Sequence, residues 1–287
     1  GPAAREWFTK EFTSAFRAKH LGKLSWFLGM AVDQDEGNSS VTVNQLKYTE
    51  KLLDKFVPNH RTGTKGLAAP CNPMTFQELT CATTATEREH MRKLPYRELM
   101  GSLLYLSTMT RPEVSYHVSV LCQFMHDPSI KSYNAALDLL IYLGHTKERC
   151  ISYSGKSDPP PNLQSQVSDQ IRSNGGLVCF SDSSWSKGDE LGYNMFGYLV
   201  SMYGGPISFA SKRLRVIATS SAEAEYAAAS YACKEVVFVR NLLTDLGFKL
   251  SGPTVELVDN MAAIKIAENN GVTAHTKHFA HAIHLIR

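Results

Sequence analysis

The chain has 287 residues, of which 43% are hydrophobic and 20% charged, and its formal net charge is +3 at pH 7. These values are typical of one large or two modest globular domains, and so small a charge does not by itself indicate a nucleic-acid binder. No apolar run is long enough to cross a bilayer, so no membrane partner is expected. Six scattered cysteines without a C-x-x-C pair favour reduced thiols in an intracellular compartment.

The chain begins with a short mixed segment. Its pattern predicts a helix over residues 7–18 and a hairpin of two apolar runs, 24–32 and 40–43, which the turn-rich stretch DQDEGNS separates. Residues 48–56 have helical spacing. Residues 57–94 carry several prolines and many Thr, Gly and Ala residues, and they predict an extended connection.

Three amphipathic helices are expected next, over residues 96–110, 111–125 and 132–146. Pro112 stands near the first turn of the second helix, where its missing N–H group costs no hydrogen bond. The short links between the helices indicate that they pack on one another. A short strand at residues 150–154 closes this mainly helical block.

The composition then changes. Residues 155–175 are rich in Pro, Ser, Gln and Gly and predict a flexible linker between two domains. Three strands are expected after it, over residues 176–182, 192–204 and 205–213, and a Gly-Gly turn joins the last two.

A long helix over residues 221–247 follows, with an apolar stripe and a final glycine. A fourth strand at 254–259 and a helix at 260–270 come after it. Three antiparallel strands, a parallel fourth strand and flanking helices predict a mixed α/β layer fold.

Three acidic residues occupy comparable places: Asp182 ends the first of these strands, Glu225 lies in the first turns of the long helix, and Asp259 ends the fourth strand. If the first and fourth strands are neighbours joined by a right-handed crossover, their carboxyl ends share one sheet edge. Three carboxylates repel one another unless a cation lies between them, and oxygen ligands suit Mg²⁺ or Mn²⁺. Two such ions about 4 Å apart promote attack of water on a phosphodiester. The pattern therefore predicts a two-ion site.

Simpler interpretations exist for each acidic residue. Asp182 could be a turn residue, and Asp259 could cap the helix that follows it, a role compatible with metal binding. Ser220 and Glu223 fit a capping box, so Glu223 is left out of the predicted ligand set.

The segment "SDSSW...GYLVSMYGGPISFASKR...ATSSAEAEYAAA...LVDNMAAIKIA...TKH" resembles the ribonuclease H domain of copia-type LTR retrotransposon polyproteins. Upstream, "HLGKLSWFLGMAV", "YTEKLLDKF", "YRELMGSLLYLSTMTRPEVSYHVSVLCQFM" and "AALDLLIYLGHT" resemble the stretch after the polymerase centre in the same polyproteins. The likeness implies a palm end, thumb and connection over residues 1–154, a linker over 155–175, and a ribonuclease H-like domain over 176–287.

The resemblance implies that Asp182, Glu225 and Asp259 are catalytic and bind the metal. The implied substrate is the RNA strand of an RNA/DNA hybrid, which such enzymes recognise by shape and by 2′-hydroxyls. The implied location is the cytoplasm, a virus-like particle or the nucleus. We also expect nucleic-acid contacts from five residues, although a solvated basic loop is an alternative for the first three: Lys212, Arg213, Arg215, Ser221 and Lys277.

Two departures from the family pattern bear on activity. The polymerase signature Tyr-x-Asp-Asp is absent, so the chain is not expected to polymerise DNA alone. The family's last strand and helix, with a fourth carboxylate, are expected beyond residue 287, and Ala280 and Ala282 stand where Asp and Arg are common. The alternative function is a catalytically weak or inert module that binds nucleic acid or protein. The rest of a reverse transcriptase, or another chain, is the expected partner that completes the sheet.

Overall fold

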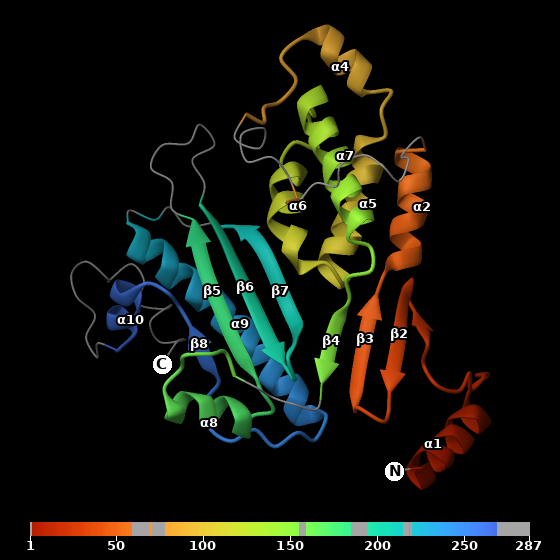
Figure 1. Cartoon of the computed structure of the whole chain (residues 1–287), viewed down its shortest axis with the longest axis vertical. Coiled ribbons are helices and arrows are strands. Elements are labelled where there is room, and N and C mark those ends of the chain that lie inside the picture. The colour runs from red at the N-terminus through yellow and green to blue at the C-terminus, as the bar shows by residue number, and fades with distance from the viewer. Residues whose placement is uncertain are drawn as a thin grey trace.

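Two four-stranded sheets, with strand orders β1-β2-β3-β4 and β7-β6-β5-β8, lie side by side with helices packed around them (Figure 1). The second sheet combines antiparallel and parallel strands, so the predicted mixed α/β class is confirmed. The structure is a computed structural model that describes residues 2–58, 69–70, 78–154, 159–184, 194–214, 218 and 220–268.

The first sheet is antiparallel and consists of β1 (Trp26–Phe27), β2 (Met30–Asp35), β3 (Ser40–Asn44) and β4 (Ile151–Ser154). The predicted hairpin is confirmed as β2 and β3, in which Val32 lies opposite Val43. The sequence did not show that β4 pairs with β3, because the partners lie far apart along the chain. The N-terminal region is therefore not only a helical block.

The helices before the second sheet are α1 (Pro2–Ala15), α2 (Leu46–Phe56), α4 (Ala85–Met91), α5 (Tyr96–Met109), η1 (Pro112–Val114), α6 (Ser115–Cys122) and α7 (Ile130–His145). The predicted helix over residues 111–125 is split into the 3₁₀ turn η1 and α6. Leucines of α5 and α7, among them Leu99, Leu103 and Leu140, form a fully buried core. In the part of the chain that the structure describes, no helix has the length and apolar character needed to span a membrane.

Helix α4 corrects the prediction of an extended connection over residues 57–94. The Thr84 hydroxyl accepts a hydrogen bond from the Glu87 N–H at 3.1 Å, and the Glu87 carboxylate accepts one from the Thr83 N–H at 3.0 Å. A Thr-x-x-Glu sequence of this kind is a helix-start signal. The prediction of an extended connection was based on the prolines earlier in the segment and missed this signal. Residues 59–68 and 71–77 of the predicted connection lie outside the described residues.

The second sheet consists of β5 (Val178–Ser184), β6 (Met195–Met202), β7 (Gly205–Arg213) and β8 (Val255–Leu257). As predicted, β5, β6 and β7 are antiparallel, and β8 adds to β5 as a parallel strand. The turn between β6 and β7 has φ +52° at Tyr203 and +81° at Gly204. Positive φ at both positions gives the tight two-residue turn whose twist matches paired strands.

Three helices accompany this sheet: α8 (Ser165–Ser173), α9 (Ser221–Asp245) and α10 (Met261–Glu268). Helix α8 lies in the predicted linker, where an irregular chain was expected. Ile171 of α8 is buried, and the Gln170 side chain donates to the Pro253 carbonyl oxygen at 2.7 Å. Val167 and Ile171 are the only apolar residues of α8, so composition alone concealed the helix.

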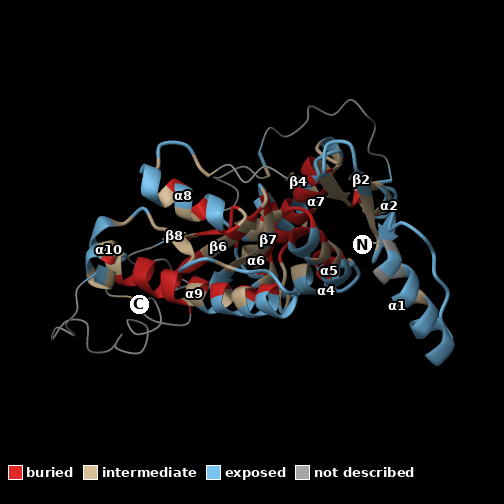
Figure 2. Ribbon diagram, turned by 90° about the horizontal axis from the view of Figure 1, so that it is seen from below, coloured by how far each residue is buried: buried red, intermediate tan, exposed pale blue. Residues whose placement is uncertain are grey.

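Helix α9 covers one face of the second sheet, and its buried side is visible in Figure 2. Cys179 and Val200 of the sheet pack there against Ala232 and Val236 of the helix. The Ser220 hydroxyl accepts a hydrogen bond from the Glu223 N–H at 3.2 Å, as the predicted helix cap requires. The Ser183 N–H near the carboxyl end of β5 donates to the Glu225 carboxylate, so the first turns of α9 lie beside this end of the strand.

Candidate metal centre and adjoining groove

Parallel pairing of β5 with β8 brings two strand ends to one sheet edge. Phe180 lies opposite Leu257 in this pairing. Asp182 lies two residues beyond Phe180, and Asp259 lies two residues beyond Leu257. The parallel pairing therefore brings both aspartates to the same edge of the sheet, as the sequence prediction assumed.

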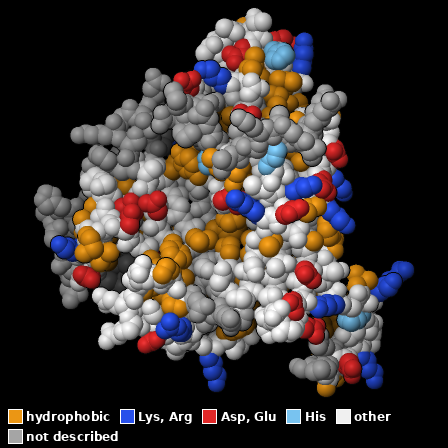
Figure 3. All heavy atoms as spheres, in the orientation of Figure 1, with side chains coloured by type: hydrophobic (Ala, Val, Ile, Leu, Met, Phe, Trp, Pro, Cys, Tyr) orange, Lys and Arg blue, Asp and Glu red, His pale blue; other side chains and the backbone are white. Residues whose placement is uncertain are grey.

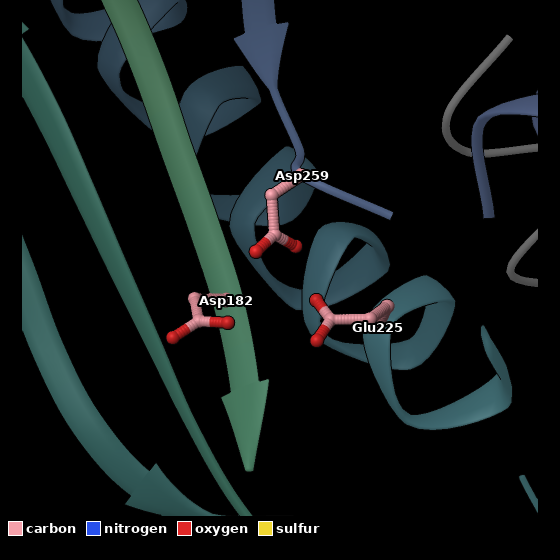
Figure 4. A group of neighbouring side chains, drawn as sticks. All are labelled: Asp182, Glu225 and Asp259. Atoms are coloured by element: carbon pink, nitrogen blue, oxygen red, sulfur yellow. The ribbon is translucent and has the colours of Figure 1, made fainter. Parts of the chain in front are cut away.

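Asp182, Glu225 and Asp259 converge at this edge, and Figure 4 shows their side chains directed toward one another from β5, α9 and the segment after β8. Each residue offers a carboxylate oxygen, and the three oxygens lie within 4.8 Å of one another. Within the described ranges, this is the one group of three or more His, Cys, Asp or Glu side chains that could hold a metal ion. Both aspartates are exposed, whereas Glu225 is only 6% exposed.

The Glu225 carboxylate is held on one side only. Its Oε1 atom accepts a hydrogen bond from the Ser183 N–H at 3.3 Å, while its buried Oε2 atom has no hydrogen-bond partner. Burial raises the pKa of Glu225, and the negative charges of Asp182 and Asp259 raise it further, against an opposing effect of hydrogen bonding from Ser183. A buried oxygen without a partner is costly, and a cation would remove this cost.

The donor set fits a hard divalent cation. Three carboxylates provide only oxygen ligands, which Mg²⁺ and Mn²⁺ prefer, and their combined negative charge requires compensation. Two exposed aspartates leave the cluster open to solvent, so a bound ion could also contact a substrate. The three residues are thus suited to holding a metal at an accessible reaction site.

The predicted nucleic-acid-binding residues are only partly brought together. Lys212 and Arg213 are exposed at the end of β7, but adjacent strand residues point to opposite faces, and only Arg213 shares the face of Asp182. Ser221 is the first residue of α9, four positions before Glu225 and hence on the same side of that helix. Two further predicted residues, Arg215 and Lys277, lie outside the described residues.

The face of the second sheet opposite α9 carries a groove of about 1190 Å³. Asp182 and Asp259 line it, and Figure 3 shows hydrophobic side chains gathered over β5–β7. A row of apolar side chains crosses all four strands of this face: Leu257, Phe180, Leu199 and Phe209. The sequence prediction missed the groove, although the alternation of Phe180, Asp182 and Ser184 along β5 was the signal for a shared face.

A partly buried carboxyl group, Glu256 on β8, was also missed. It accepts hydrogen bonds from the Ser181 hydroxyl at 2.8 Å and the Cys233 thiol at 3.0 Å. Burial raises the pKa of Glu256, against the lowering effect of these two donors. Glu256 lies opposite Cys179 on the α9 side of the sheet, so it is separate from the carboxylate cluster.

Three relatives match almost the whole chain. The retrovirus-related Pol polyprotein from transposon TNT 1-94 of Nicotiana tabacum is 29% identical over 96% of this chain. The corresponding polyproteins from transposons RE1 and RE2 of Arabidopsis thaliana are 30% and 31% identical, each over 95% of this chain. The chain spans only 19%, 17% and 17% of the lengths of these three relatives. No family model and no solved structure matches it.

The similarity over almost the whole length shows that this two-sheet α/β chain is homologous to retrovirus-related Pol polyproteins. These homologues are polyproteins of copia-type transposons, as the resemblance predicted.

Proposed function

We propose that residues 176–287 form a ribonuclease H-like domain that hydrolyses the RNA strand of an RNA/DNA hybrid. The observation that carries this proposal is the convergence of Asp182, Glu225 and Asp259 within 4.8 Å at an accessible sheet edge. Homology to Pol polyproteins supports an enzymatic role in general terms. Two Mg²⁺ or Mn²⁺ ions, once bound, would supply the charge that activates water and stabilises the leaving oxygen.

Each residue of the cluster has a separate role in this proposal. Glu225 is buried and tied to the backbone of β5 through Ser183, so it anchors the site to the fold. Asp182 and Asp259 are exposed, so their carboxylates face the side from which a phosphodiester can approach. Arg213, on the same sheet face as Asp182, is suited to contact a neighbouring phosphate.

The remaining assignments follow from the same proposal. Residues 1–154 correspond to the palm end, thumb and connection of a reverse transcriptase, and 155–175 join them to the nuclease domain. The protein acts inside the cell, in the cytoplasm, a virus-like particle or the nucleus. The rest of the reverse transcriptase, or another chain, completes the second sheet.

Cleavage of a labelled RNA/DNA duplex in Mn²⁺ tests the proposal. We expect the chain to cleave the RNA strand to leave a 3′-hydroxyl, and Asp182→Asn to lower the rate by at least roughly 100-fold, because it removes a metal ligand. Asp245→Asn is the matched control, since Asp245 is an exposed carboxylate at the far end of α9. Titration calorimetry should show that Asp182→Asn binds Mn²⁺ more weakly than the unaltered chain, whereas Asp245→Asn binds it equally well.

Absence of cleavage by the unaltered chain, with unchanged duplex binding by Asp182→Asn, would instead support a binding module. Equal cleavage by the unaltered chain and Asp182→Asn would exclude the carboxylate cluster as the catalytic centre.

A further inference from the structure

Gly197 occupies a special place beside the carboxylate cluster. It lies on β6 directly opposite Asp182 of β5 and, on its other side, opposite Ser211 of β7. These three residues share the groove face of the sheet and all line the groove. Neighbouring strands are about 4.8 Å apart, so the strip from Asp182 to Ser211 is roughly 10 Å wide, and beyond Asp182 it carries no side chain larger than a hydroxymethyl group.

The fold itself does not require glycine at this position. The φ angle of Gly197 is not in the positive range that favours glycine. Among the described residues, an added Cβ atom would come near only the Ala210 carbonyl oxygen, at 3.7 Å, which is an ordinary contact. Glycine weakens the interior of a strand, and it is often found where a ligand approaches the backbone closely.

A second, independent observation indicates that a ligand belongs here. Glu225 is 6% exposed, and its Oε2 atom has no hydrogen-bond partner although its carboxylate is directed into the cluster with Asp182 (Figure 4). A cation in the cluster would satisfy this oxygen, and the strip begins at the same aspartate. Beyond the strip, the Arg213 side chain projects from the same face.

We propose that the strip formed by Gly197 and Ser211 is the path of the sugar-phosphate backbone of the substrate strand. A substrate strand that reaches Asp182, which would help to hold the cation, continues over Gly197, where the absence of a side chain allows close approach. The Ser211 hydroxyl then donates to a phosphate oxygen, and Arg213 provides a compensating positive charge. This subsite rests on the proposed nuclease function, because it requires a nucleic-acid substrate at the cluster.

Substitutions of Gly197 that add volume without adding charge test the subsite. Gly197→Val should lower the affinity for an RNA/DNA hybrid at least 10-fold, measured by fluorescence anisotropy in Ca²⁺ to separate binding from cleavage. Affinity for Mn²⁺, measured by calorimetry without nucleic acid, should stay within about 2-fold, because no ligand is changed. Gly197→Ala should raise the melting temperature and lower hybrid affinity at least 3-fold.

Gly101→Ala is the control, since its added Cβ enters open space in α5 and Gly101 does not line the groove. It should leave both affinities unchanged. If Gly197→Val binds Mn²⁺ more weakly or has a lower melting temperature than the unaltered chain, the valine has disturbed the carboxylate cluster or the fold. The hybrid affinity of Gly197→Ala, which adds less volume, then tests the subsite.

The outcomes separate the subsite from the nuclease proposal. Unchanged hybrid affinity and cleavage in both Gly197 variants would overturn the subsite and leave the nuclease intact. If the unaltered chain binds the hybrid without cleaving it, and both Gly197 variants bind it more weakly, the nuclease proposal is overturned. The same result supports the proposed path of the strand over Gly197. An unaltered chain that does not bind the hybrid would overturn both.

Discussion

At the scale of single residues, the chemistry depends on a carboxylate that the fold buries at a cost. Glu225 is almost inaccessible, close to two aspartates and satisfied at only one of its oxygens. The stability of the metal-free protein should therefore depend on the charge of this residue, and a bound cation should reverse that dependence.

Glu225→Gln tests this dependence on pH. Burial raises the pKa of Glu225, so its contribution to stability is present below the usual carboxyl range and is lost as pH rises through the raised pKa. We expect the variant to unfold with nearly the same free energy as the unaltered chain near pH 4. Near pH 7, without metal, it should be more stable by on the order of 1 kcal/mol, as measured by urea denaturation.

Addition of Mn²⁺ provides the control for this experiment. The unaltered chain should gain about 2.7 kcal/mol at an ion concentration of 100 times its Kd, whereas Glu225→Gln should gain much less. A variant that is less stable than the unaltered chain at every pH, with or without Mn²⁺, would contradict the role given to Glu225.

The three acidic residues could be predicted because each stands near the end of a strand or the start of a helix, although β5 continues past Asp182 to Ser184 and Asp259 lies two residues after β8. Gly197 and Glu256 could not be identified in the same way. Their importance depends on which residues face them across neighbouring strands, and that register is set by tertiary pairing rather than by local pattern.

At the scale of elements, α9 is the part that holds Glu225 in place. It begins at the Ser220 cap, and Gly247 follows its end with φ +86° and a hydrogen bond from the Phe248 N–H to the Leu243 carbonyl oxygen at 2.9 Å. This is the pattern of a glycine-terminated helix. Both ends were predicted from the sequence, because caps are local signals.

Loss of the N-terminal cap should be measurable. Ser220→Ala removes the oxygen that accepts from the Glu223 N–H, and we expect it to lower the free energy of unfolding by about 1 kcal/mol in urea denaturation. Ser220→Thr keeps an acceptor and should lose less than half of this amount. Equal stability of Ser220→Ala and the unaltered chain would show that water replaces the cap without cost.

Long elements with a continuous apolar stripe, such as α5, α7 and α9, were predicted from periodicity alone. Helix α8 and strand β4 show where this approach fails. The two buried residues of α8, Ser168 and Ile171, include only one apolar side chain, and β4 is a short strand whose pairing partner lies far away in the sequence. Their structure comes from tertiary contacts, which override weak local preference.

At the scale of the whole molecule, the two sheets meet where β4 contacts the turn between β6 and β7. The Ser154 N–H donates to the Tyr203 carbonyl oxygen at 2.9 Å, and the Tyr153 hydroxyl donates to the Pro206 carbonyl oxygen at 2.7 Å. Gly205 lies directly against this junction. The predicted linker at residues 155–175 indicated two separate domains, but these two hydrogen bonds join the sheets directly, without the residues of the linker.

Gly205→Ala should weaken the junction between the sheets. An added Cβ atom would lie 2.6 Å from the Ser152 carbonyl oxygen and 2.6 Å from Tyr153 Cδ1, and a backbone oxygen cannot move away cheaply. We expect a loss of about 1–3 kcal/mol in the free energy of unfolding, as for other overpacked sites. Hydrogen exchange should become faster at the Ser154 amide, while amides in the core of α5 change little if the loss is confined to the junction. Gly101→Ala adds the same methyl group in open space and should instead stabilise α5 by up to about 1 kcal/mol. If both alanine variants are equally stable and the Ser154 amide stays protected, the two sheets are not held together by this close contact.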